Sequence, residues 1–178
     1  MNREKFTKEL FEAVEIVTGV TEQQIKSRTK AGAIPDARKI IINILRTNKD
    51  KFEKKASWRS IGLEVGYEGC GPHSCAITMN KKALNYLDVD PEFQKDYKKV
   101  LIMRHFISKL KRIDGQRVRN WKVNIQGGAF VVSVCNGTND YIDAPKIKSP
   151  KGFEILRSSV LEMDGRQTIF RYVLNCKN

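Results

Sequence analysis

The chain has 178 residues and is strongly basic, with 33 Lys and Arg against 20 Asp and Glu and a net charge of +13. Apolar residues make up 40% of it, which is enough to bury a core and excludes a disordered chain. The charge favours a polyanionic partner, nucleic acid or an anionic membrane surface. No apolar run reaches the length of a membrane span, and no apolar stretch follows the N-terminal charges as in a signal peptide. We therefore expect a cytoplasmic protein with reduced cysteines.

The first part of the chain has helical periodicity with recognisable helix ends. Gly19 stops the first apolar face, and Thr21 with Gln24 forms a capping-box pattern. Pro35 begins a strongly apolar segment, and Ser57 and Asp90 stand where N-caps are expected. The pattern predicts helices over residues 3–19, 21–27, 35–48, 58–66, 73–87 and 91–113.

From residue 117 onward the pattern changes to alternation. Residues 118–126 and 129–136 read as a hairpin closed by Gly127-Gly128, and residues 153–163 and 166–176 as another closed by Asp164-Gly165. One face of such a small sheet must be covered, either by the last helix or by a second copy of the chain. We therefore predict an α+β fold. A helical domain over residues 1–114 is followed by an antiparallel β domain over residues 115–178, with the boundary near 114–116.

The segment "SWRSIGLEVGYEGCGPHSCAITMNKKALNYL" predicts a short helix, a tight turn and a longer helix, the layout of a helix-turn-helix. In that motif the second helix enters the major groove, and its N-terminal residues meet base edges. On this interpretation His73, Ser74 and Cys75 face the bases, while Lys81 and Lys82 reach phosphates. The N-terminus of the helix adds its own positive potential there.

Three segments, "GVTEQQIKSRTKAGAIPDARKIIINILR", "SWRSIGLEVG" and "PHSCAITMNKKALNYL", together resemble the C-terminal DNA-binding domain of the bacterial replication initiator DnaA. The consensus of that family runs approximately G-V-x-x-x-x-I-K-S-R-x-R, A-R-Q, I-G-x-x-F and D-H-T-T-V, in this order. The resemblance covers about residues 15–87 and implies a fold like that of the Trp repressor.

The resemblance also implies roles for the matching residues. Arg28 falls in a basic loop whose arginine enters the minor groove, and His73, Ser74 and Cys75 match residues that read bases in the major groove. The residues expected to contact phosphates are Lys26, Lys30, Arg38, Lys81 and Lys82. Two departures are that Pro72 replaces a base-reading Asp and that the turn is longer. No G-x-x-x-x-G-K-[ST] motif of the initiator ATPase is present, so we expect a detached DNA-reading module, as suits phage or mobile-element proteins.

A metal site and an enzyme are the less favoured interpretations. Cys70, His73 and Cys75 are close in sequence, but structural zinc needs four ligands, and His105, Cys135 and Cys176 are scattered. Asp140 and Asp143 form a carboxylate pair without a third partner. We therefore expect no metal, no cofactor and no catalysis.

The leading prediction is a sequence-specific double-stranded DNA-binding protein that controls transcription or replication. An adaptor that binds host replication or transcription proteins is the alternative, motivated by Pro72 and the longer turn. Single-strand or RNA binding by the β domain ranks below both, since its aromatic residues are few. The basic amphipathic segment "KKVLIMRHFISKLKR" also admits a membrane-surface role. The β domain is open to dimerisation, to protein binding, or to added DNA contacts through Arg117, Arg119, Lys122, Lys146, Lys148 and Lys151.

Overall fold

The computed structural model describes residues 1–69, 71–110, 112–113, 116–117, 120–126, 129–136, 146–150, 153–164 and 167–176. Contacts divide the chain into two compact units, Met1–Val100 and Leu101–Asn178. The sequence placed the domain boundary near residues 114–116, whereas this division falls inside the helix α6 (Pro91–Leu110). The reason is that the second half of α6 packs on the sheet that follows it: the ring centroids of Phe106 and Tyr172 are 5.1 Å apart.

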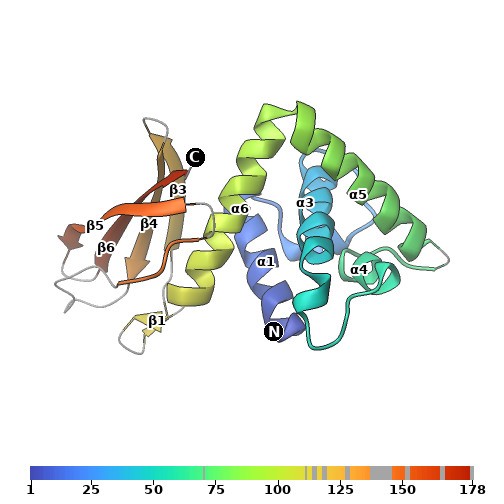
Figure 1. The fold of residues 1–178 in the computed structure, drawn as a ribbon, viewed down its shortest axis with the longest axis horizontal. Helices are drawn as coiled ribbons and strands as arrows, with labels where there is room; N and C mark the ends of the chain where they lie inside the picture. The colour runs from blue at the N-terminus through green and yellow to red at the C-terminus, as the bar shows by residue number, and fades with distance from the viewer. Residues whose placement is uncertain are drawn as a thin grey trace. The chain divides into compact units, whose positions relative to one another are not determined.

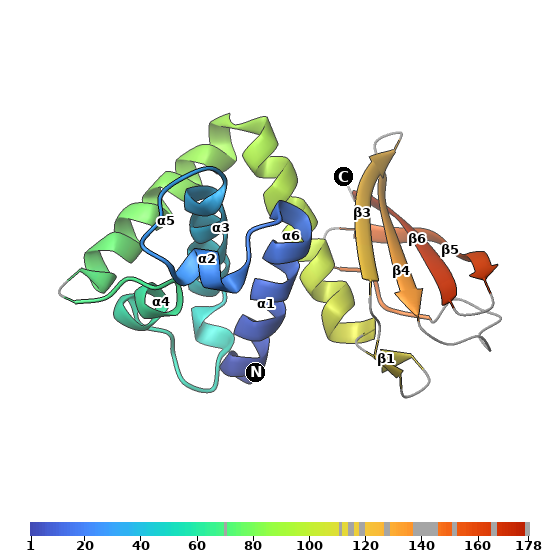
Figure 2. The ribbon, with the colours of Figure 1, turned by 180° about the vertical axis from the view of Figure 1, so that it is seen from behind.

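The first unit is helical and is built around α3 (Figure 1). Contacts join α3 to α1, α2, α4 and α5, and the same helices surround it when the molecule is seen from behind (Figure 2). The isoleucines of α3 are the reason for this central position, because Ile40, Ile41, Ile42 and Ile44 are all at most 1% exposed. Each such side chain contributes about 1.5–3 kcal/mol through burial. The helices are α1 (Arg3–Thr18), α2 (Glu22–Lys26), α3 (Ile34–Thr47), η1 (Lys49–Lys51), α4 (Trp58–Glu64), α5 (Pro72–Val89) and the first half of α6.

Four helix ends follow the sequence signals. Gly19 ends α1 in the left-handed conformation, with φ of 72°, and Thr21 and Gln24 form both hydrogen bonds of the capping box at α2. The Ser57 side chain accepts a hydrogen bond from the Ser60 N–H at the start of α4. Asp90 Oδ1 accepts from the N–H groups of Glu92 and Phe93, both at 3.1 Å. These predicted caps are confirmed.

The second unit contains a four-stranded antiparallel sheet in the order β3-β4-β6-β5. The predicted α+β class and both predicted hairpins are confirmed. Gly127, Gly128 and Gly165 lie outside the described residues, and Asp164, which was expected in the second turn, instead ends its strand and pairs with Gln167. The predicted helix over 91–113 is too long: α6 ends at Leu110, because Arg112 and Ile113 pair as a short strand instead. The strands are β1 (Arg112–Ile113), β2 (Gln116–Arg117), β3 (Asn120–Gln126), β4 (Ala129–Asn136), β5 (Phe153–Asp164) and β6 (Gln167–Cys176).

The last helix, α6, covers one face of this sheet. The sequence had left open whether this helix or a second copy of the chain covers it. Phe130, Val132, Phe170 and Tyr172 lie on that face and are at most 5% exposed. The apolar residues of the second half of α6 are buried as well: Ile102, Met103, Phe106 and Ile107. The amphipathic face of α6 therefore packs inside the protein rather than on a membrane surface. Among the described residues, no helix has the length and apolar content that crossing a membrane requires.

Candidate nucleic-acid interface

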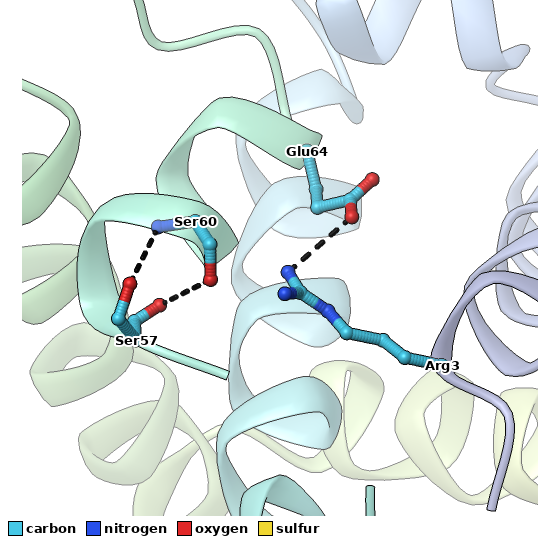
Figure 3. Close-up of polar contacts among 4 residues, drawn as sticks. All are labelled: Arg3, Ser57, Ser60 and Glu64. Carbon is cyan, nitrogen blue, oxygen red and sulfur yellow. Dashed lines mark hydrogen bonds and ion pairs between the residues drawn. The ribbon is translucent and has the colours of Figure 1, made fainter. Parts of the chain in front are cut away.

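Helix α4 is fixed at both of its ends (Figure 3). At its start, Ser57 Oγ accepts from the Ser60 N–H at 3.1 Å, and Ser60 Oγ donates to the Ser57 carbonyl at 2.9 Å. At its end, the Glu64 carboxylate forms a half-buried ion pair with the Arg3 guanidinium of α1, with an N–O distance of 3.3 Å. A helix of only seven residues is marginal alone, so these contacts and its packing on α5 define its position.

Gly62 lets the start of α5 approach the backbone of α4. A Cβ atom at Gly62 would lie 2.2 Å from the carbonyl oxygen of Pro72, which is the first residue of α5. Pro72 is itself buried, and proline suits the first turn of a helix because it has no N–H to leave unpaired. Pro72, which stands where the resembled family has an Asp, is thus buried at the contact between α4 and α5.

Arg38 has a structural role, and its predicted phosphate contact is corrected. Its side chain is 3% exposed, and its Nε donates to the Ile25 carbonyl at 2.8 Å. Nη1 donates to the Thr29 carbonyl at 2.7 Å, and Nη2 donates to the Ser27 carbonyl. Because these donors are used on backbone carbonyls, the guanidinium is not available to a phosphate. It anchors instead the segment that carries Arg28.

The structure brings two predicted DNA-contacting segments together. One open hollow, of about 430 Å³, is lined from the loop after α2 by Ser27, Arg28 and Lys30, and from the start of α5 by Gly71 and Cys75. The Arg28 side chain is 96% exposed, and its guanidinium lies 3.9 Å from the Glu68 carboxylate in the turn between α4 and α5. Residues far apart in sequence therefore line one hollow, whose exposed cations, Arg28 and Lys30, both come from the loop after α2.

A second hollow, of about 300 Å³, adjoins the start of α5 and contains a residue that the sequence analysis missed. It is lined by Arg59 of α4 together with Gly69, Pro72 and His73. Arg59 and His73 are both exposed. The available signal was the position of Arg59 in the first turn of α4, since the first helix of a helix-turn-helix crosses the phosphate backbone.

The remaining predicted contact residues lie on α5 and α2. Ser74, Lys81 and Lys82 are exposed along α5, and Ser74 Oγ donates to the Gly71 carbonyl at 3.2 Å. Gly71 gives α5 no side-chain cap, which leaves the first N–H groups of the helix open to a ligand or water. Lys26 is exposed too, but its ammonium lies 2.5 Å from the Glu22 carboxylate and lines a different hollow with Arg3 and Glu64. Lys26 therefore lines a different hollow from Arg28.

The hollow beside Cys75 also contains Tyr67, whose hydroxyl is buried and has no hydrogen-bond partner among the described residues. Burial raises the pKa of Tyr67, the charge of Arg38 opposes that rise, and Cys75 adds to it. The predicted absence of zinc stays a prediction, since Cys70 lies outside the described residues. Within the described residues, no three His, Cys, Asp or Glu side chains are grouped as a metal site requires.

Comparison with known proteins gave no match to a family model, to a curated protein or to a solved structure. The resemblance to the DnaA DNA-binding domain therefore stays a prediction from the sequence.

Proposed function

We propose that the first unit binds duplex DNA sequence-specifically, with α4 and α5 as a helix-turn-helix. The observation that carries the proposal is the shared hollow in which Arg28 and Lys30 of one segment lie beside Cys75 of another. The loop after α2 and the start of α5 must lie side by side if both contact one ligand. Nothing in the local sequence of either segment requires them to do so. Both segments that the sequence predicted to contact DNA thus line the same hollow.

In the proposed complex the start of α5 enters the major groove. His73 and Ser74 contact base edges, and Cys75 packs its thiol against the groove as a small and weakly polar group. The uncapped first turn of α5 directs N–H groups and positive potential at a phosphate. Arg28, extending from its anchored loop, reaches the neighbouring minor groove.

The affinity in this proposal comes from salt-sensitive phosphate contacts. Arg59, Lys30, Lys81 and Lys82 are exposed cations on the same three segments, namely α4, the loop after α2, and α5. Each phosphate that they neutralise releases a counterion, so the logarithm of the binding constant falls with the logarithm of salt by about 0.9 per contact. The protein would act on chromosomal or mobile-element DNA in the cytoplasm, as a regulator of transcription or replication.

A binding titration with duplex and single-stranded DNA of the same sequence tests this proposal. We expect tighter binding to the duplex, a salt slope corresponding to about four phosphate contacts or more, and a lower slope in Arg59→Gln. Equal affinity for duplex and single-stranded DNA would favour single-strand binding instead. No binding to the duplex at moderate salt would favour the adaptor alternative.

A further inference from the structure

The second unit has a basic surface that the proposed helix-turn-helix does not use. Residues 101–178 contain 14 Lys and Arg against six Asp and Glu, a net charge of +8. Residues 1–100 contain 19 against 14, a net charge of +5. The larger share of the positive charge therefore belongs to the unit for which no role has been assigned.

Part of this charge is held in a defined place by His105. Residues 146–150, the strap, have no regular secondary structure, and the His105 imidazole donates a hydrogen bond from Nε2 to the Lys148 carbonyl at 2.7 Å. The ring packs edge-on against Phe106, with centroids 6.1 Å apart, so it is itself fixed. At its far end the strap is joined to β5, where the Phe153 N–H donates to the Pro150 carbonyl at 3.1 Å.

This attachment turns the lysines of the strap outward. Lys146 and Lys148 are exposed, whereas Ile147 and Ser149, which alternate with them, are half-buried and Pro150 is buried. The hydrogen bond to α6 uses only the main chain of Lys148, which leaves its ammonium in solvent. No salt bridge found among the described residues includes Lys146 or Lys148.

Helix α6 adds positive charge beside the strap. Lys109 is exposed one turn after His105, and Arg104 precedes it. Burial lowers the pKa of His105, and the charges of Lys109 and Arg104 lower it further, against the hydrogen bond to the Lys148 carbonyl. Those effects require both cations to lie near the imidazole. The strap and α6 thus form one electropositive face, defined by Lys109, Lys146 and Lys148.

We propose that this strap–helix face is a second contact surface for duplex DNA and binds the phosphate backbone without reading sequence. Exposed ammonium groups on the strap and on a helix complement a row of phosphates, which lysine binds as a point charge. The inference rests on the proposed function. It extends that function, because the first unit then contacts base edges and the second unit contacts only the phosphate backbone.

A matched pair of triple variants of the full chain tests the proposal. Lys109→Gln, Lys146→Gln and Lys148→Gln together remove three charges from the face. Lys54→Gln, Lys55→Gln and Lys98→Gln together remove three exposed charges from the first unit, none of which belongs to α4, α5 or the Arg28 loop. Both variants are titrated with a random-sequence duplex over a series of salt concentrations, and thermal unfolding checks that both remain folded.

We expect the first variant to bind the duplex about tenfold more weakly near physiological salt, with a salt slope smaller by about two to three. The control variant should change affinity less than threefold. His105→Ala, which keeps every formal charge of the face but releases the strap, should lose about threefold. Equal behaviour of the two triple variants would overturn the inference, and so would full affinity in His105→Ala.

The outcomes also separate this inference from the proposed function. If the wild type binds no duplex, the proposed function fails and the inference fails with it. If the wild type binds and the first variant matches the control, only the inference fails. Binding to phosphatidylserine–phosphatidylcholine vesicles is measured in parallel. A loss of vesicle binding with unchanged duplex binding would mark the face as a membrane contact and would also overturn the inference.

Discussion

The α-carbon of Gly66 faces the carbonyl group of Lys26 so closely that a Cβ atom there would lie 2.2 Å from the oxygen. Gly66 also has a φ of 82°, in the left-handed region. This contact joins the end of α2, from which the Arg28 loop departs, to the turn that precedes α5. The placement of the two proposed DNA-contacting segments therefore depends on a residue that contacts no DNA in the proposal.

A comparison of Gly66→Ala with Gly69→Ala isolates this contact. Gly69 has a similar φ of 72°, but a Cβ atom there would have no neighbour within 4 Å. Ala at Gly69 therefore adds backbone strain alone, about 1–2 kcal/mol. Ala at Gly66 adds the same strain and a backbone overlap, which costs about 1–3 kcal/mol more. Chemical denaturation of both variants measures the difference. Equal losses of unfolding free energy would show that the close approach to Lys26 is not required.

For Gly62→Ala, the sign of the change in stability tests the packing of α4 on α5. Helix propensity alone would make Ala at this interior position of α4 stabilising by about 1 kcal/mol. The overlap with the Pro72 carbonyl, 2.2 Å from the added Cβ, should make it destabilising instead, by about 1–3 kcal/mol. Because the α4–α5 packing would open, duplex affinity should fall as well. A variant that is more stable than the wild type would contradict the close packing of the two helices.

Variants of Arg38 and Lys30 should distinguish a residue that stabilises the fold from one that binds DNA. Arg38→Gln removes donors from one buried and two partly buried backbone carbonyls, so we expect a loss of about 2 kcal/mol or more in unfolding free energy. Lys30→Gln changes an exposed side chain, so its stability should stay within about 0.5 kcal/mol of the wild type, while its salt slope falls by about 0.9. If Arg38→Gln instead kept its stability and lost the salt slope, the phosphate contact predicted from the sequence would be right.

Tyr97 should make the stability depend on pH at the alkaline end. Burial raises the pKa of Tyr97 to about 12 from 10.0, and its hydroxyl donates to Asn43 Oδ1 at 2.7 Å. The folded state keeps the proton longer than the unfolded chain, so this stabilisation is complete below pH 10 and is lost as the pH rises toward 12.

Tyr97→Phe removes both the ionisation and the hydrogen bond. At neutral pH it should lower the unfolding free energy by about 1 kcal/mol. Between pH 10 and 12 the decline of its stability should be shallower than that of the wild type. Denaturation across this range measures both effects. Parallel curves for the two proteins would contradict the raised pKa of Tyr97.

The sequence predicted the fold well where local physics decides and less well where distant residues meet. The cap at Ser57 and the capping box at Thr21 depend on neighbours within three residues, so their patterns were sufficient. The burial of Arg38 depends on carbonyls up to 14 residues away, and a cation in a basic segment gives no sign of it. Arg59 was missed although its place in the first turn of α4 could be read from the sequence, since its proximity to His73 arises only when α4 packs on α5.

The central claim is that the start of α5 reads bases, and selection from a random duplex library near physiological salt tests it most directly. The wild type is compared with His73→Ala and with Lys82→Ala, which removes an exposed cation further along the same helix. We predict a sequence motif for the wild type, a blurred motif for His73→Ala, since one base contact contributes about 1–3 kcal/mol of discrimination, and an unchanged motif at lower affinity for Lys82→Ala. No enriched motif from the wild type, or the same motif from His73→Ala, would contradict it.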